Sequence, residues 1–336
     1  MDPDAVRGIG REPHGGSDDR ELLDFSANTN PETPDGVRAV YEAALDRSRR
    51  YPPEPPTAFR EAAAGFLAVE PEQVVPSPGG LAAVRLAIET AVGPGDTVLV
   101  PAPSFGEYAR EVRLQGAEPA VVPHDEVFQS DPTPHALAVV CNPNNPTGDA
   151  YDDGALRGFA DRCRAAGTPL LVDEAFLGFT DRPSLAGVDG VIVARSLTKL
   201  FGLPGLRAGY AVATGDRLAA LTAARPPWNV GTPARAVGVH CLRQASFVAE
   251  TRERVRAERE RVRRALADRF DVPRSDAPFL LVDVGDRDVD DVVDTLREQG
   301  IAVRDATTFR GLDAHVRVAV RLPEENDRLL AAFDRV

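Results

Sequence analysis

The sequence predicts an α/β fold, in which a large domain is built on a mostly parallel sheet with helices on both faces and is followed by a small α+β domain. From Thr97 onward, short β-rich runs alternate with amphipathic helical stretches, which is the pattern of parallel strands joined by helices. A long Arg/Glu-rich helix through residues 252–264 then leads into a shorter mixture of strands and helices. The 336 residues are enough for one large and one smaller domain.

The predicted elements follow from apolar spacing along the chain. Residues 1–36 are rich in Gly, Pro, Asn and Asp and are expected to form an irregular N-terminal arm. In the large domain, residues 37–235, apolar residues three or four apart predict helices and short apolar runs predict strands. These helices are expected near 34–47, 58–68, 80–91, 105–115, 152–166 and 214–222, and the strands at 97–100, 119–122, 136–140, 170–172, 191–194 and 208–212.

The small domain is expected to span residues 236–336. Its long helix places Val255, Val262, Leu266 and Phe270 on one face and Arg/Glu pairs on the other, which indicates a solvated helix surface rather than an RNA-binding patch. The remaining predicted elements are strands at 279–284, 301–304 and 316–320, a helix at 289–298 and a last helix from about 323.

Composition argues against several classes of protein. The net charge of −13 disfavours nonspecific nucleic-acid binding. The three cysteines are too few and too far apart for a disulfide framework or a zinc site, so we expect no metal and a reducing compartment. No run of about 18 apolar residues occurs and the first residues do not resemble a signal peptide, so we expect no membrane segment and a cytoplasmic location.

Lys199 is the only lysine in the chain, whereas arginine is abundant. A desolvated amine can lose its proton and attack a carbonyl, whereas a guanidinium stays charged. Lys199 therefore suggests Schiff-base chemistry, with hydroxyls at Ser196 and Thr198 beside it and Arg207 available to bind a phosphate. The alternative is a surface lysine left over in an arginine-biased chain.

Several polar or glycine-rich clusters fall at predicted strand ends, where ligands collect in parallel sheets. Ser77-Pro78-Gly79-Gly80 opens a helix and could cradle a phosphate, and no GxGxxG dinucleotide motif is present. Each cluster also has an ordinary structural explanation. Asp173 could cap a helix, Asn145 to Gly148 could be a plain turn and Phe105 could be a core residue.

The arm contains two further clusters. His14-Gly15-Gly16 could place an imidazole beside an approachable backbone, although a flexible turn is the simpler interpretation. The segment from Asp24 to Pro31 could equally be a capped strand end.

Together, the segment Ser196 to Arg207 and the strand-end clusters resemble the fold type I pyridoxal-phosphate (PLP) enzymes of the class I/II aminotransferase family. The resemblance covers nearly the whole chain and implies the PLP-dependent transferase fold and PLP as cofactor. It implies that Lys199 holds the cofactor aldehyde, that Asp173 pairs with the pyridine nitrogen and that Asn145 binds the ring oxygen O3′. Phe105 corresponds to the aromatic residue that stacks on the ring.

The same resemblance implies the anchoring of both cofactor and substrate. Tyr51 resembles the tyrosine that reaches the phosphate of a neighbour's cofactor, which implies a homodimer. Arg317 matches the arginine that binds the substrate α-carboxylate. The implied phosphate-binding positions are Ser77, Gly79, Gly80, Ser196, Thr198 and Arg207. The sequence departs from the family pattern at Ser17, Pro78, Leu81 and Ala82.

Within the family, several segments look more like the cobalamin-pathway threonine-phosphate decarboxylase than like histidinol-phosphate aminotransferase. They include His14, Asn30 in the segment 24–31, Phe176, where the aminotransferase usually has a tyrosine, and Arg321 as a second cation beside Arg317. Arg304 and Arg310 could extend that anion site.

The resemblance therefore predicts decarboxylation of L-threonine O-3-phosphate to aminopropanol phosphate, with a small phosphorylated substrate and a homodimer. The first alternative is a histidinol-phosphate-type aminotransferase, and the second is a non-catalytic PLP-binding sensor.

Overall fold

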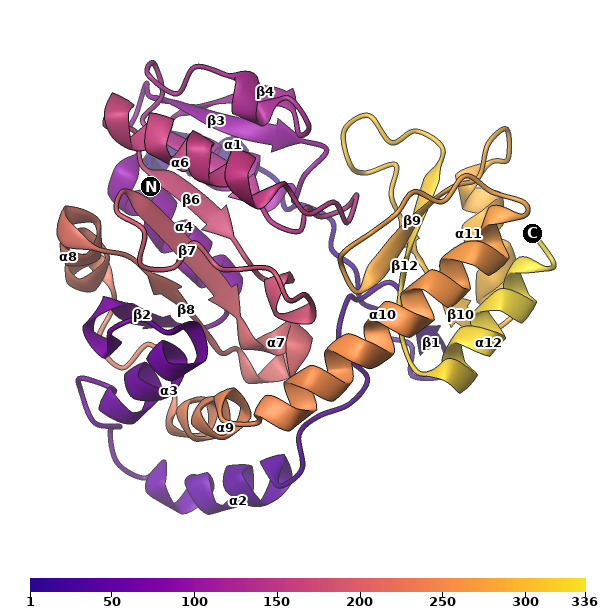
Figure 1. The fold of residues 1–336 in the computed structure, drawn as a ribbon, viewed down its shortest axis with the longest axis horizontal. Coiled ribbons are helices and arrows are strands. Elements are labelled where there is room, and N and C mark those ends of the chain that lie inside the picture. The colour runs from indigo at the N-terminus through magenta and orange to yellow at the C-terminus, as the bar shows by residue number, and fades with distance from the viewer.

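A seven-stranded sheet forms the centre of the larger domain in the computed structural model, which describes residues 1–336 (Figure 1). Six strands run in one direction, and β8 is antiparallel to both of its neighbours, β2 and β7. In spatial order the strands are β2 (Val74–Ser77), β8 (Gly209–Val212), β7 (Val191–Ser196), β6 (Leu170–Asp173), β5 (Leu137–Cys141), β3 (Thr97–Ala102) and β4 (Glu118–Pro123).

Alternate residues of the central strands enter two separate cores, one on each face of the sheet. In β6, Leu170 and Val172 belong to one apolar cluster and Leu171 belongs to the other. This period of two places Asp173, at the end of β6, on the same face as Leu171. Cys141 at the end of β5 lies on that face too.

Helices cover both faces, as the sequence predicts. The face shared by Leu171 and Cys141 is covered by α4 (Gly80–Ala91), α5 (Glu107–Leu114) and α8 (Gly215–Ala224). The other face is covered by α3 (Thr57–Leu67), α6 (Asp153–Ala166) and α9 (Thr232–Leu242), with α2 (Val37–Arg47) packed on α9. Figure 1 shows α6 and α4 on opposite sides of the sheet.

The long helix α10 (Ala245–Ala267) leads from the large domain to the small one (Figure 1). The small domain has an antiparallel sheet in the order β11 (Arg304–Asp305), β12 (His315–Ala319) and β9 (Phe279–Asp283). The helices α11 (Val289–Glu298) and α12 (Pro323–Phe333) pack with α10 around this sheet in a third core.

The N-terminal arm connects the two domains. Its short helix α1 (Pro3–Gly8) contacts α5, and the backbone N–H of Asp2 donates to the carbonyl of Leu114 at 2.8 Å. Its strand β1 (Leu23–Asp24) pairs with β10 (Ile301–Ala302) of the small domain. The arm therefore passes from one domain to the other across the carboxyl ends of the large sheet.

The elements absent from the sequence-based expectation include α1, β2 and α9. The helix α1 begins at Pro3, where proline is tolerated because the first helical N–H needs no partner. The strand β2 contains Pro76, which hides its strand character, and α9 begins with Thr232-Pro233 and contains Gly238. The expected division between the domains at residues 235 and 236 stays a prediction, and it falls inside α9.

The predicted strand 301–304 is divided between two partners, because Ala302 pairs with the arm and Arg304 pairs with β12. None of the helices combines the length and the apolar character needed to cross a bilayer.

Candidate active site

A cavity of about 290 Å³ opens where the carboxyl ends of the large sheet meet the arm and the small domain. Strand-end residues of the large domain form its floor, and Asp173 and Lys199 are among them. The arm contributes residues 12–15 and 26–28, and the small domain contributes Arg304 and Arg317. Three parts of the chain that are distant in sequence therefore share one cavity.

Lys199 reaches this cavity from α7 (Leu197–Leu200), the helical turn that follows β7. Burial, and secondarily the nearby cations of Arg317 and Arg207, lower the pKa of the Lys199 amine to about 8. The amine makes no ion pair with any residue of the chain. A far larger fraction of it is therefore unprotonated near neutral pH than for an ordinary lysine, which a nucleophilic lysine requires.

This lowered pKa predicts how the rate of cofactor loading depends on pH. Only the neutral amine attacks an aldehyde, so the rate at which the apo-protein forms a covalent bond with PLP should rise with pH and level off above about 8. An ordinary lysine would give a rate that is still rising near pH 10. The rate of growth of the visible absorption band after mixing apo-protein with PLP measures this profile, and a midpoint near 10 would contradict the environment described for Lys199.

Asp173 is buried at the end of β6 and accepts two hydrogen bonds. The Tyr108 hydroxyl donates to Oδ2 at 2.7 Å, and the backbone N–H of Ala175 donates to Oδ1 at 2.9 Å. Burial raises the pKa of the Asp173 carboxyl, although these hydrogen bonds act in the opposite direction. A cationic group placed against Asp173 would favour the ionised carboxylate, so this position suits a protonated ring nitrogen.

Tyr108 is not among the site residues that the sequence predicts. It lies in α5 three residues after Phe105, and the two rings pack edge to face with centroids 5.6 Å apart. Three residues is the spacing of neighbours on one helix face, and this spacing is the signal that could have identified Tyr108. Its hydroxyl is the only side-chain hydrogen-bond donor to Asp173.

The phosphate-binding positions gather around the start of α4. No side chain caps this helix, so the N–H groups of its first turn are free to bind an anion beside Gly80 and Leu81, which line the cavity. Ser196 and Thr198 face the same space, and their hydroxyl oxygens lie 2.7 Å apart. Of the predicted phosphate-binding residues, four line the cavity: Gly80, Ser196, Thr198 and Arg207.

Two predicted phosphate ligands lie just outside the cavity lining. Ser77 is buried, and its hydroxyl donates to the carbonyl of Gly79 at 2.9 Å, so it holds the turn together. Gly79 lies against Arg207, whose Nη2 would be 2.5 Å from a Cβ at that position. Ser77 and Gly79 therefore shape the loop, whereas Gly80, Ser196, Thr198 and Arg207 line the cavity itself.

Arg317 occupies the small-domain side of the cavity. Its guanidinium lies over the rings of Phe279 and Phe309, donates through Nη1 to Asn145 Oδ1 and donates through Nη2 to the Ser26 carbonyl at 3.2 Å. Burial, and secondarily Arg304, lower the pKa of Arg317 to about 9.

Arg304 faces the same space from β11. It is the direct cross-strand partner of Arg317, so the two side chains project from one face of the small sheet. Its Nη2 donates to the Pro13 carbonyl at 3.0 Å and to Thr308 Oγ1 at 2.7 Å. Neither arginine makes an ion pair within the chain, although both are more than nine-tenths buried.

The arm supplies His14 and Gly15. His14 Nε2 lies 3.0 Å from Glu107 Oε1, and its ring centroid lies 5.6 Å from that of Phe105. A Cβ on Gly15 would lie 2.2 Å from the Ser26 carbonyl oxygen, so only glycine allows the arm to pass this close. His14 and Gly15 of the cluster His14-Gly15-Gly16 are therefore part of the cavity wall.

Two predicted substrate residues are not brought to the cavity. Asn30 is buried and donates to Leu200 O and Thr251 Oγ1, and the residue of this segment that lines the cavity is Asn28, whose Oδ1 has no partner. Arg321 lies beyond the end of β12 and pairs with Glu325 at 3.0 Å. Because each side chain is engaged elsewhere, neither faces the cavity.

Tyr51 and Phe176 complete the predicted set. Tyr51 is 80% exposed, lies outside the cavity and packs on Trp228 with the ring centroids 4.6 Å apart and the ring planes tilted by 31°. Phe176 lines the cavity and packs edge to face on Phe279 at 5.1 Å, so no hydroxyl is available there. Arg310 is exposed and does not line the cavity.

The residues present fit PLP. The cavity offers an amine with a lowered pKa, a buried carboxylate, an aromatic ring at Phe105 and an uncapped helix start beside Arg207. When bound, PLP would act as an electron sink for chemistry at the Cα of an amino compound.

Comparison with known proteins identifies relatives along almost the full chain. Residues 20–333 match the family described as Aminotransferase class I and II. A relative from Archaeoglobus fulgidus, histidinol-phosphate aminotransferase 2, is 30% identical over 329 residues, which cover 95% of this chain and 94% of that protein. The histidinol-phosphate aminotransferase of Methanosarcina mazei is 31% identical over 332 residues, with 93% of this chain and 88% of that protein covered.

Solved structures share the fold. The histidinol-phosphate aminotransferase from Clostridium acetobutylicum superposes with a TM-score of 0.83 at 23% identity, covering 93% of this chain and 98% of that one. The L-threonine-O-3-phosphate decarboxylase from Porphyromonas gingivalis superposes with a TM-score of 0.83 at 24% identity, covering 92% and 98%. The family match, the two archaeal relatives and the PLP-fitting cavity lead to one conclusion: this chain belongs to the class I and II aminotransferase family, and it is a PLP-dependent enzyme with the type I fold.

Proposed function

We propose that this enzyme transfers the amino group of a small phosphorylated amine, with L-histidinol phosphate as the first candidate substrate and a 2-oxo acid as the amino acceptor. The observation that carries the proposal is the pair Arg304 and Arg317. Like charges directly opposite each other on paired strands repel, and these two are buried without an ion pair. A phosphate dianion between them would remove this repulsion and supply oxygen acceptors for both guanidinium groups.

The charges of the whole cavity support a second phosphate in addition to that of PLP. Lys199, Arg207, Arg304 and Arg317 all line it, and none of the four makes an ion pair within the chain. The three arginines fall into two groups, Arg207 beside the start of α4 and the Arg304–Arg317 pair in the small domain. One group suits the cofactor phosphate, and the other suits an anion on the substrate.

The named relatives favour histidinol phosphate over threonine phosphate. Both archaeal relatives are histidinol-phosphate aminotransferases at 30% and 31% identity. The strand pairing of Arg304 with Arg317 also forms one anion site, and histidinol phosphate carries one anionic group whereas threonine phosphate carries two. In this proposal Lys199 moves the proton from the substrate Cα, because its amine has a pKa of about 8 and faces the cavity.

A second candidate, decarboxylation of L-threonine O-3-phosphate, is favoured by Phe176. This position lacks the tyrosine hydroxyl that the sequence resemblance associates with the aminotransferase, and Phe176 is packed against Phe279. His14 and Gly15, which also suggested the decarboxylase, line the cavity.

One comparison of products separates the candidates. PLP-loaded protein is incubated with L-histidinol phosphate and 2-oxoglutarate, and glutamate is measured; in parallel, it is incubated with L-threonine O-3-phosphate alone, and released CO₂ is measured. Glutamate formation that depends on histidinol phosphate is the expected result. CO₂ release without glutamate formation would replace the proposal with the decarboxylase, and bound PLP with neither product would favour the non-catalytic sensor.

We also propose that the enzyme is a homodimer in which each chain completes the other's site. Tyr51 and Trp228 form a tilted pair of exposed aromatic rings, and Glu54 ties their two segments together through Arg225 and the Trp228 N–H. Exposed aromatic pairs of this kind are typical of protein interfaces.

Light scattering on the purified protein should give twice the mass of one chain. Inactive Tyr51→Ala and Lys199→Ala variants should recover partial activity when mixed, because one site of a mixed dimer would then have both residues intact. A monomer in solution would contradict the proposal.

A further inference from the structure

The turn that contains Asn145 ends at Gly148, and Gly148 is in direct contact with the small domain. This turn follows β5, and its residue Gly148 accepts a hydrogen bond on its carbonyl from the backbone N–H of Asp276 at 2.8 Å. Gly148 has φ +83°, and a Cβ there would lie 2.1 Å from Ser275 Oγ. The two segments are therefore in contact with no room between them.

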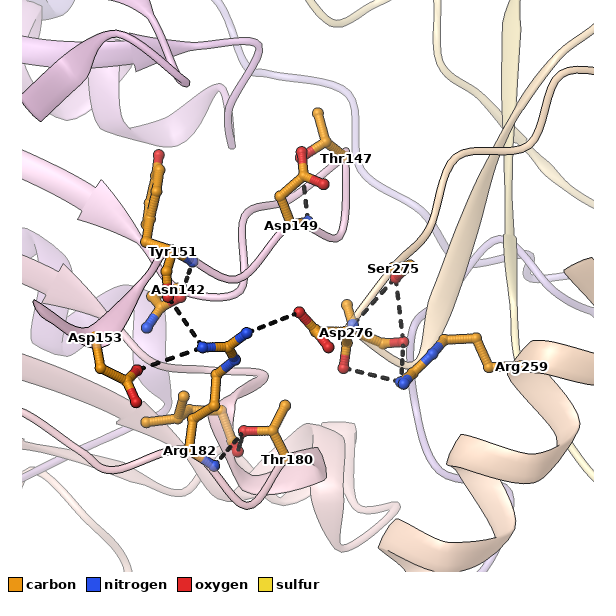
Figure 2. Close-up of polar contacts among 12 residues, drawn as sticks. Asn142, Thr147, Asp149, Tyr151, Asp153, Thr180, Arg182, Arg259, Ser275 and Asp276 are labelled. Atoms are coloured by element: carbon orange, nitrogen blue, oxygen red, sulfur yellow. Dashed lines mark hydrogen bonds and ion pairs between the residues drawn. The ribbon is translucent and has the colours of Figure 1, made fainter. Parts of the chain in front are cut away.

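The small-domain segment that contacts Gly148, Ser275–Asp276, is fixed by hydrogen bonds of its own. Ser275 Oγ donates to the Phe279 carbonyl at 2.7 Å, which ties the segment to the first residue of β9. Arg259 of α10 donates through Nη1 to the carbonyls of Asp276 at 2.9 Å and Ala277 at 3.1 Å. Figure 2 shows Ser275, Asp276 and Arg259 on the small-domain side of the boundary.

Arg182 adds a bridge from the large domain (Figure 2). Its Nη2 lies 3.5 Å from Asp276 Oδ2, and its Nη1 donates to the Tyr151 carbonyl at 3.2 Å and lies 3.5 Å from Asp153 Oδ1. The side chains of Arg182 and Asp276 are partly exposed, so their ion pair orients the Asp276 segment more than it stabilises the fold.

Within the turn, hydrogen bonds connect Gly148 to Asn144, the residue that directly precedes Asn145. The Gly148 N–H donates to the Asn144 carbonyl at 2.8 Å, and the Asn144 N–H donates to the Asp149 carbonyl at 2.7 Å. The Asn144 amide nitrogen donates to Thr147 Oγ1 and to Pro103 O, both at 3.1 Å. A displacement of Gly148 is therefore transmitted through the turn rather than absorbed by it.

The cavity end of the same turn is also held by the small sheet. Arg317 Nη1 donates to Asn145 Oδ1, and Arg317 lies in β12, which pairs with β9. Because its amide oxygen is occupied by Arg317, Asn145 presents its NH₂ group, which has no partner within the chain, toward the cavity.

We propose that Ser275 and Asp276 are positioning residues for Asn145: together with Arg317, they make the small domain set the orientation of the Asn145 amide toward the cofactor ring. This inference rests on the proposed role of Asn145 as the donor to O3′ of PLP. A donor at O3′ favours its ionised form. The pH midpoint of the visible absorption band of bound PLP therefore reports the position of Asn145 without any turnover.

The test is the variant Gly148→Ala, whose methyl group would push the turn away from Ser275. We expect it to raise the pH midpoint of the visible band by about one unit, because a misplaced amide no longer stabilises the ionised O3′. The double variant Gly148→Ala/Ser275→Gly removes the atoms that the methyl group would meet, so it should restore the midpoint. Ser275→Gly alone measures the effect of losing the serine.

A matched control separates this push from the strain of placing alanine in a left-handed conformation. Gly167 at the end of α6 has φ +76°, close to that of Gly148, and has no neighbouring atom within 4 Å of a Cβ position. Gly167→Ala should therefore leave the midpoint unchanged while costing similar stability. Should Gly148→Ala fail to fold, Asp276→Asn, which keeps the backbone N–H and removes the charge facing Arg182, should raise the midpoint by a smaller amount.

The outcomes separate this inference from the proposed function. A normal band whose midpoint is the same in wild type, Gly148→Ala and Asp276→Asn would overturn the positioning role of Ser275 and Asp276. A raised midpoint that the double variant does not restore would also overturn it. Failure of the wild-type protein to form the band at all would instead contradict the assignment of Lys199 and the cofactor site.

Discussion

The substitution Lys199→Ala is expected to abolish turnover and covalent cofactor attachment together. Lys199 is the only lysine in the chain and is the only amine that faces the cavity, so no other side chain can replace it. Loss of a positioned acid or base costs about 10² to 10⁴ in rate, and loss of the covalent attachment adds to this cost. We expect kcat to fall at least about 10³-fold.

The measurement is the chain mass after borohydride treatment, combined with steady-state kinetics. Wild type should gain the mass of one reduced cofactor and Lys199→Ala should gain none. Lys199→Arg is the matched control, because it keeps the positive charge but cannot form the bond. Turnover by Lys199→Ala above about a tenth of the wild-type rate, far outside the range expected for loss of an acid–base group, would refute the role of Lys199.

Removal of either cavity arginine is expected to cost activity toward the phosphorylated substrate, and removal of Arg304 is expected to cost activity toward that substrate only. A hydrogen bond to a charged group is worth about 1.5 to 3 kcal/mol, so Arg304→Leu and Arg317→Leu should each lower kcat/KM for histidinol phosphate by about 10- to 100-fold. Arg304→Leu should change kcat/KM for unphosphorylated histidinol by less than about threefold, because the group that Arg304 binds is absent. Arg317→Leu should lower that value too, because Arg317 also holds Asn145 Oδ1. Equal losses with both substrates in Arg304→Leu would show that Arg304 serves the fold and not the phosphate.

Arg321→Gln is the control for this comparison. Arg321 pairs with Glu325 outside the cavity, so its replacement should change kcat/KM by less than about threefold while lowering the melting temperature. If Arg321→Gln lost as much activity as Arg304→Leu, the placement of Arg321 away from the substrate would be wrong.

The sequence by itself determined the centre of the site. Lys199 is identified by its uniqueness, Asp173 lies directly after an apolar run, and Asn145 lies in the turn that follows another such run. The family resemblance then implies the roles of Asp173 and Asn145. Strand-end residues can be predicted in this way because parallel strands place their carboxyl ends on one edge of the sheet. The period of two along β6 then directs Asp173 toward the cavity face, and the structure adds the Tyr108 hydroxyl and the Ala175 N–H that hold it.

Only the tertiary structure decided which arginines and asparagines share the cavity. Arg304 and Arg317 are brought together because β11 and β12 pair in that register, and no sequence spacing reveals the register. Arg321 was the expected second cation, but β12 ends at Ala319 and the chain turns into α12, where Glu325 is available. In the arm, the hydrogen bonds of Asn30 to Leu200 and Thr251 leave Asn28 to face the cavity.

The physical reason for this division is the range of the interactions. Strand ends, helix starts and a lone reactive amine are properties of a few adjacent residues. The pairing of β11 with β12, the path of the arm and the contact of Ser275 with Gly148 depend on segments more than a hundred residues apart or on the exact register of two short strands. Such contacts are fixed by packing and by the partners that each polar group finds when the chain folds.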